Sequence, residues 1–261
     1  MWPGILVAVI AGASPFGDTA SWSVSRTEEI KVLPADAGAA VTIRLVTTVI
    51  SSEEQERSFM RAAVRLPDGR SDDVTRAITE RINQGLDDGT LREAQDQLAH
   101  GGFGGFQSRT ITVDLNRAPW LDVRVCDDEM GAYPSTSCAH VRVNVETGSE
   151  WTWTDAILPQ RRAQFFTATT PRFAREAKKQ QDAWGDDENF EFVNAYGLFP
   201  NEFDARRFDD AELDDEGLAL WVGTSAPHVL QGAMWRFALP ASALKKFVDP
   251  AGPLGHLVAQ K

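Results

Sequence analysis

The side chains of this sequence that could carry chemistry are 38 carboxylates, four histidines and two cysteines. The histidines show no H-x-x-H, H-x-x-x-H or H-E-x-x-H spacing, so a histidine-based metal centre is not predicted. A serine hydrolase is not indicated either, because no G-x-S-x-G motif is present. We therefore expect no metal site, no bound cofactor and no enzymatic activity. The four histidines are His100, His140, His228 and His256.

A pair of carboxylates leaves one enzymatic alternative open. Retaining and inverting glycosidases need only two acidic side chains at the right separation, so a glycan hydrolase stays the second hypothesis. Calcium binding is a third reading of the acidic run at positions 209–216. Its spacing differs from the EF-hand loop, and a solvated charged turn is the simpler interpretation.

Cys126 and Cys138 are 12 positions apart and bracket a turn-rich stretch at 127–134. In an exported protein they predict one disulfide that closes a hairpin-like loop, contributing about 3 kcal/mol through loop entropy. Two reduced, buried thiols in a cytosolic protein are the alternative.

The net charge of −12 disfavours binding to nucleic acid or to anionic membrane surfaces. It is concentrated in positions 182–217, which hold thirteen acidic and two basic residues, interleaved with aromatic side chains. We predict that this segment forms an acidic face for a cationic partner. The partner-binding candidates in it are Asp186, Asp187, Glu188, Asp209, Asp210, Asp214 and Asp215.

An apolar run at positions 5–13 lies close to the N-terminus and precedes small residues. It is far shorter than the roughly 20 residues that span a bilayer, which favours a signal peptide over residues 1–20. A buried N-terminal strand is the alternative. A secreted or periplasmic location is expected, with no transmembrane anchor in the mature chain.

These residues must be positioned by strands and helices whose apolar spacing is clear. Strand-like patterns cover 24–52 and 59–66, and apolar residues four apart predict a helix that begins near 71–73 and ends before the glycines at 101–105. The glycines are interpreted as a helix stop and turn, because they match no phosphate-binding motif. Alternating strands follow at 110–115, 120–125 and 140–145.

A long helix is predicted from about 155 to 184, kinked or divided by Pro171, with short strands at 218–222 and 234–239. Trp151 and Trp153 are expected to pack in the core. The fold class is α+β, with antiparallel sheets packed by an amphipathic helix in each half.

Three ordered stretches resemble a known family. They are residues 131–158, with a G-A-Y-P turn, V-N-V-E-T-G and W-T-D-A-I-L; residues 208–220; and residues 232–244. Together they resemble the extracellular domain shared by RsiV-type anti-sigma factors and PdaC-type peptidoglycan deacetylases, with its usual companion domain upstream. The deacetylase histidine motif is absent. The family loop with two tyrosines reads P-H-V-L-Q-G here, and His228 stands at the first tyrosine position.

The resemblance implies a non-catalytic envelope module that binds a lysozyme-like cationic protein or peptidoglycan, and it adds His228 to the partner-binding candidates. An envelope glycan hydrolase remains the alternative. The predicted organisation is a signal peptide at 1–20, an N-terminal α+β module at 21–129, the family-like domain at 130–250 and a C-terminal tail at 251–261.

Overall fold

The computed structural model describes residues 23–33, 38–102, 104–132, 134–185, 190–200, 203, 211–214, 216–223 and 234–259. The expected signal peptide at 1–20 lies outside these residues. By internal contacts, the chain divides into unit 1, Met1–Glu150, and unit 2, Trp151–Lys261. No helix in the described part of the chain is long and apolar enough to cross a membrane.

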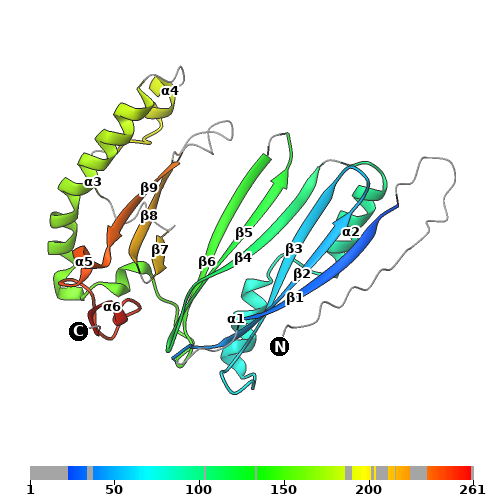
Figure 1. Ribbon diagram of the computed structural model, residues 1–261, viewed down its shortest axis with the longest axis horizontal. Coiled ribbons are helices and arrows are strands. Elements are labelled where there is room, and N and C mark those ends of the chain that lie inside the picture. Colours follow the sequence, from blue (N-terminus) through cyan, green and yellow to red (C-terminus); the bar gives the residue numbers. More distant parts are fainter. Residues whose placement is uncertain are drawn as a thin grey trace. The chain divides into compact units, whose positions relative to one another are not determined.

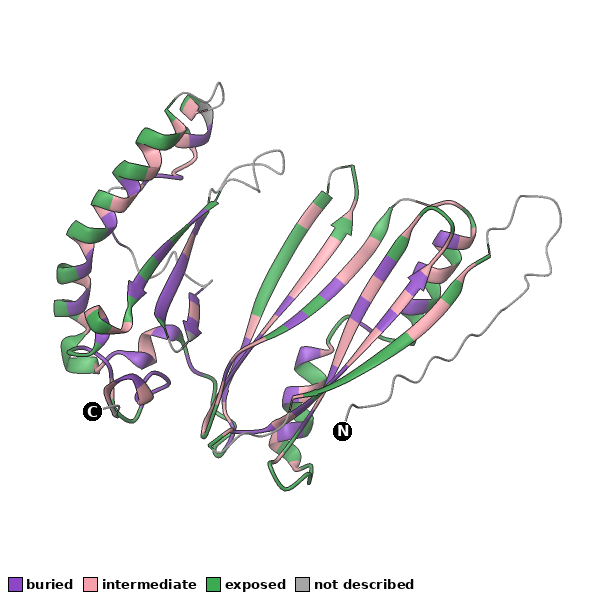
Figure 2. Ribbon diagram, viewed as in Figure 1, coloured by how far each residue is buried: buried purple, intermediate pink, exposed green. Residues whose placement is uncertain are grey.

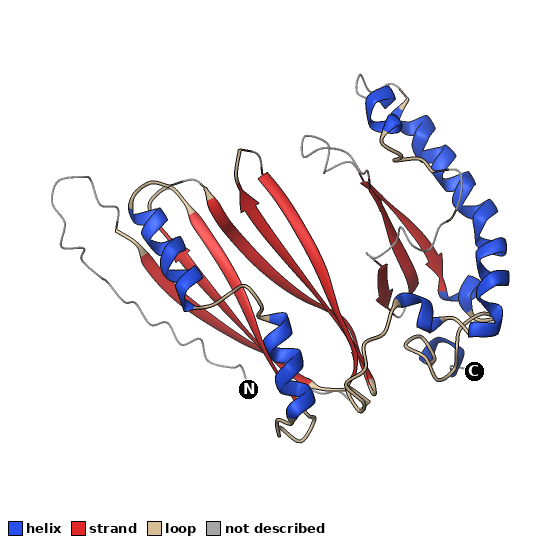
Figure 3. Cartoon of the chain, turned by 180° about the vertical axis from the view of Figure 1, so that it is seen from behind, coloured by secondary structure: helices blue, strands red, loops and turns tan. Residues whose placement is uncertain are grey.

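Unit 1 is a six-stranded sheet with two helices on one face (Figures 1 and 3). The spatial order of the strands is their order in the sequence, and every pairing is antiparallel except that of β3 with β4. The elements are β1 (Ser25–Leu33), β2 (Thr42–Ser51), β3 (Glu56–Arg65), α1 (Asp73–Ile82), α2 (Asp88–Ala99), β4 (Gly105–Arg117), β5 (Trp120–Met130) and β6 (Pro134–Asn144).

Helices α1 and α2 follow the predicted apolar spacing and begin at aspartate caps. The Asp72 carboxylate accepts a hydrogen bond from the Thr75 N–H at 2.8 Å, and Asp87 caps α2 in the same way. Ile78 and Ile82 of α1 are buried against the sheet. The apolar spacing and the aspartate caps therefore both indicate the helices that the structure contains, α1 and α2.

The glycine loop after α2 ends the helix, as predicted. Gly101 has a φ of +70°, a left-handed conformation that glycine adopts at no steric cost. The buried guanidinium of Arg57 donates to the carbonyls of Gly102 and Gly104 at 3.1 Å each and to Gln97 Oε1 at 2.7 Å. Burial lowers the pKa of Arg57. An arginine therefore binds the loop carbonyls, and the loop is a structural turn.

Strands β5 and β6 form a longer hairpin than their apolar alternation predicts. They pair without interruption from Trp120 opposite Asn144 to Met130 opposite Pro134. Backbone pairing continues through polar positions, where Thr136 Oγ1 donates to Asp128 at 2.6 Å. The boundary between the units lies after Glu150, whereas the sequence placed it after Glu129, within this hairpin.

Unit 2 combines a three-stranded antiparallel sheet, in the order β7-β8-β9, with a long helix. Its elements are the 3-10 turns η1 (Trp153–Ala156) and η2 (Pro159–Arg161), then α3 (Arg162–Trp184), α4 (Phe190–Ala195), β7 (Ala211–Asp214), β8 (Gly217–Gly223), β9 (Met234–Pro240), α5 (Ala241–Leu244) and α6 (His256–Ala259). The α+β class is confirmed in both units.

Aromatic rings fill the core of unit 2. Phe173 of α3 stacks on Trp235 with ring centroids 5.5 Å apart and meets Phe237 edge-on at 5.0 Å. Trp151 and Trp153 are buried, as predicted. Helix α3 is not divided at Pro171 and runs for 23 residues.

The C-terminal segment, expected to be a tail, packs onto unit 2 over its described length. Leu254 has no exposed surface, and Leu257 is buried. The N–H of Asp249, just before this segment, donates to the carbonyl of Ala156 at 2.9 Å. The described end of the chain is therefore part of the folded unit.

Candidate functional site

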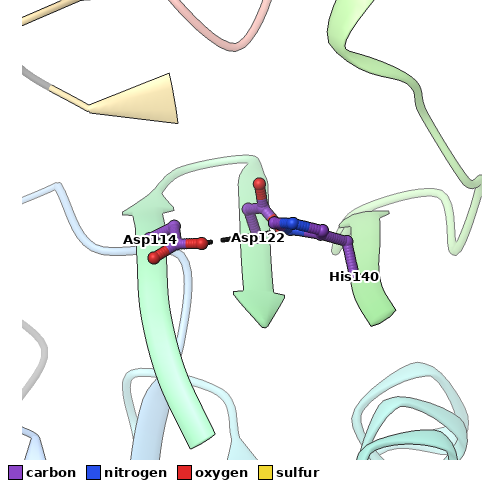
Figure 4. A group of neighbouring side chains, drawn as sticks. All are labelled: Asp114, Asp122 and His140. Carbon is purple, nitrogen blue, oxygen red and sulfur yellow. Dashed lines mark hydrogen bonds and ion pairs between the residues drawn. The ribbon is translucent and has the colours of Figure 1, made fainter. Parts of the chain in front are cut away.

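Three side chains able to bind a metal or move a proton meet on neighbouring strands of unit 1 (Figure 4). Asp114 comes from β4, Asp122 from β5 and His140 from β6, with one ligand atom of each within 4.8 Å of the others. Nδ1 of His140 lies 2.8 Å from Asp122 Oδ1 and 3.9 Å from Asp114 Oδ2. The Asp122 side chain has no exposed surface.

Strand register produces this cluster. Val123 is buried in the core shared with α1, so its neighbours Asp122 and Arg124 point to the opposite face of the sheet. In β6, Arg142 lies opposite Asp122, and His140 lies opposite Arg124. In β4, Val113 lies opposite Val123, so the next residue, Asp114, lies on the same face as Asp122, although a register shift makes Leu115 the backbone partner of Asp122.

Two arginines balance the charge of the two carboxylates. Nε of Arg142 donates to Asp122 Oδ2 at 2.9 Å, and Nε of Arg124 lies 3.3 Å from Asp114 Oδ2. The cluster therefore contains two anions and two cations around one imidazole. We name these five residues the buried charge network: Asp114, Asp122, Arg124, His140 and Arg142.

The chemistry of this network favours structure over catalysis. A divalent cation would have to displace guanidinium groups from both carboxylates in a mostly buried site. Both carboxylates are already bound by arginines, so neither is free to donate a proton to a glycosidic oxygen as a glycosidase acid must. Sequence reasoning missed the network, because its members are dispersed over three strands. The signal in the sequence was that polar residues recur at alternate positions in each of the three strand-like runs, so that they share one face of the sheet.

Cys126 and Cys138 form the predicted disulfide. They occupy directly opposed positions of β5 and β6, two residue pairs along from Arg124 and His140 and therefore on the same face of the sheet. The bond therefore joins adjacent strands beside the buried charge network. Disulfides persist in oxidising environments, and this one agrees with an extracytoplasmic compartment.

Most of the predicted partner-binding residues lie outside the described residues. They are Asp186, Asp187, Glu188, Asp209, Asp210, Asp215 and His228. Asp214 is the last residue of β7 and pairs with Gly217 of β8. Whether these side chains gather on one face therefore stays a prediction.

The described parts of the acidic segment, positions 182–217, show how it is attached. Leu198 is fully buried, and its carbonyl accepts a hydrogen bond from Trp235 Nε1 at 2.9 Å. Phe199 packs against Trp184 and Phe190, with ring centroids 6.4 and 5.9 Å apart. By contrast, the described carboxylates of Asp182, Glu191 and Glu216 lie on exposed residues. Apolar residues thus anchor the segment, while these acids face solvent.

The described surface includes a pocket in unit 2 and an open depression in unit 1. A pocket of about 290 Å³ in unit 2 is bordered by Arg172, Glu216 and Arg236, with Leu218 and Leu239 among its apolar residues. Arg236 also lies 3.4 Å from Glu212, a carboxylate that compensates its charge. An open depression of about 730 Å³ follows the solvent side of α2. Neither hollow contains a recognisable catalytic arrangement.

Fold and site together define an α+β protein of two sheet-containing units with a cross-strand disulfide. Its structure is similar to a DUF3298 family protein from Pseudomonas aeruginosa at 15% identity and a TM-score of 0.44, covering 88% of this chain and 95% of that one. A DUF3298 family member from Bacteroides fragilis is similar at 9% identity and a TM-score of 0.48, covering 87% of this chain and 100% of that one. No protein-family description and no curated protein matches the sequence.

Proposed function

We propose that this chain is a non-catalytic binding module of the cell envelope, secreted or periplasmic, that recognises a cationic protein such as lysozyme. The acidic segment at 182–217 is the proposed contact surface. The observation that carries the proposal is its imbalance of thirteen acidic against two basic residues. Opposite charge on a partner would speed encounter and select against anionic competitors.

The anchoring of the acidic segment supports this role. Its described apolar residues Leu198 and Phe199 are buried in unit 2, and Trp235 donates a hydrogen bond to the carbonyl of Leu198. Among the described residues, Asp182, Glu191 and Glu216 are exposed while Leu198 and Phe199 are buried, so these three charges are carried on a folded support. Such a support lowers the entropy cost of binding.

The disulfide and the sequence resemblance support the location. The Cys126–Cys138 bond agrees with an oxidising compartment. The motifs at 131–158, 208–220 and 232–244 resemble a domain that serves as the lysozyme-binding part of anti-sigma factors. The buried charge network, with its carboxylates bound to arginines, does not supply the pair of carboxylates that the alternative, a glycan hydrolase, would need.

Calorimetric titration of the full chain with lysozyme tests the proposal. Binding is expected at low salt and should weaken as salt approaches physiological strength, because the Debye length falls to about 8 Å. The triple substitution D186N, D187N and E188Q should lower the affinity by about tenfold or more. An absence of binding at both salt concentrations would reject lysozyme as the partner.

A matched triple variant separates a local surface from overall charge. E53Q, E54Q and E56Q remove the same three charges from exposed positions in unit 1. This variant should bind nearly as well as the wild type. Equal losses in both triple variants would show that total charge, and not the acidic segment, controls binding.

A further inference from the structure

The two edges of the unit 1 sheet differ in how they are protected against pairing. Edge strands expose backbone N–H and C=O groups, and proteins usually protect them with charged side chains, proline or bulges. Strand β1 carries four charged residues among its nine: Arg26, Glu28, Glu29 and Lys31. It is therefore a protected edge.

Strand β6 forms the opposite edge, and its distal half lacks this protection. Residues 134–139 read P-S-T-S-C-A, contain no charged side chain, and are mostly exposed (Figure 2). Proline occurs only at the first position. Within the part of the chain that the structure describes, no strand pairs with the outer side of these residues. We call residues 134–139 the neutral edge.

The neutral edge is also held in a regular conformation. All six residues pair in register with β5, and the disulfide of Cys138, the fifth of the six, fixes the strip to Cys126. Two of the acids on the neighbouring strand β5 are already bound. Asp127 accepts two hydrogen bonds from Arg109 at 2.6 Å, and Asp128 accepts from Ser108 and Thr136 at 2.6 Å each. The strip therefore offers straight, accessible backbone with small side chains.

We infer that the neutral edge pairs with the same edge of a second copy of this chain, forming a two-fold dimer with a sheet that continues across both copies. Two copies with a net charge of −12 each repel one another, and this uncharged strip allows their close approach. Antiparallel pairing of two identical strands satisfies the backbone N–H and C=O groups of both edges at once. The two-fold symmetry of this contact stops the assembly at two copies. The charged edge of β1 disfavours head-to-tail growth through β1.

The contact is small, so the dimer is weak and depends on concentration. Six paired residues bury less than the roughly 1,000 Å² typical of stable interfaces, so we expect a weak dimer with a dissociation constant on the order of 100 µM. Salt should strengthen the dimer, because it screens repulsion between the acidic copies. This dependence is opposite to that expected for the cationic partner, so the two proposals succeed or fail separately.

Sedimentation velocity of the full chain from about 5 to about 500 µM, at low and high salt, tests the inference. The decisive variant is S137K, which places a lysine on the neutral edge at an exposed position with no side-chain hydrogen bond among the described residues. V32K adds the same charge to β1, where Val32 is 54% exposed. Circular dichroism and the intact mass would establish that both variants are folded and disulfide-bonded.

S137K should raise the dissociation constant by about tenfold or more, whereas V32K should leave it unchanged or slightly lower. A general charge effect would predict the reverse for S137K, because an added lysine reduces repulsion between two acidic copies. A wild-type chain that stays monomeric throughout would overturn the inference. So would an S137K variant that dimerises normally, or a V32K variant that loses the dimer equally.

Discussion

Nδ1 of His140 lies 2.8 Å from Oδ1 of Asp122, a carboxylate without exposed surface. Because an ionised carboxylate only accepts hydrogen bonds, the imidazole donates through Nδ1. The second oxygen of Asp122 accepts from Arg142 at 2.9 Å. One buried carboxylate thus joins β5 to β6 through two side chains of β6.

D122N should destabilise unit 1 by about 3–5 kcal/mol, because it leaves the positive charge of Arg142 buried without its partner. Urea unfolding followed by circular dichroism measures the change. D182N is the matched control in an exposed ion pair with Lys178, and it should cost less than about 1 kcal/mol. If D122N and D182N lowered the free energy of unfolding by similar amounts, burial of the Asp122–Arg142 pair would not explain the loss.

Removing the disulfide should lower the free energy of unfolding by about 3 kcal/mol, as expected for a loop of this length. The double variant C126A and C138A, or reduction of the wild type, tests this in thermal and urea unfolding. Reductant should have no effect on the double variant. Two free thiols in the protein isolated from its native compartment would contradict the disulfide and the proposed location.

Acid should weaken the start of α1. Hydrogen bonds from the Thr75 N–H and hydroxyl hold the pKa of Asp72 below its ordinary value. A lowered folded-state pKa contributes stability above the unfolded pKa of about 3.9, and this contribution is lost as pH falls through the folded value. D72N should keep the cap at neutral pH but lose this part of the pH dependence, whereas D72A should be weaker at neutral pH as well. Urea midpoints at pH 7 and pH 3 distinguish the variants.

Gly217 should tolerate no side chain. Its φ is +145°, and a Cβ would meet the carbonyl oxygen of Leu239 and lie 2.9 Å from the N atom of Ala241. G217A should therefore destabilise unit 2 by at least about 2 kcal/mol. Gly223, at the other end of β8, has open space at its Cβ position, so G223A should be close to wild type in the same thermal melt.

Local signals predicted the helices better than the ends of the strands. Apolar residues four apart and the Asp72 cap define α1 in both sequence and structure. The distal part of the β5–β6 hairpin carries no such signal, because Ser135, Thr136 and Ser137 pair through their backbone. Side-chain alternation therefore ends several residues before the ladder does.

The buried charge network could not be located from sequence, since no short motif joins Asp114, Asp122 and His140. Their proximity depends on the pairing of β4, β5 and β6. The predicted disulfide did carry usable information, because pairing Cys126 with Cys138 fixes the register of β5 against β6. That register already places Asp122 opposite Arg142.

The parallel pairing of β3 with β4 spans only two residue pairs, Ser58 with Ser108 and Phe59 with Arg109. The sheet thus consists of two antiparallel three-stranded halves, joined by this narrow parallel pairing and by the crossover through α1 and α2. We expect each half to be a cooperative folding unit of its own, with the disulfide in the second half. Amide hydrogen exchange should then show different protection in the two halves of unit 1. The β3–β4 pairing would be the weakest part of an otherwise continuous sheet.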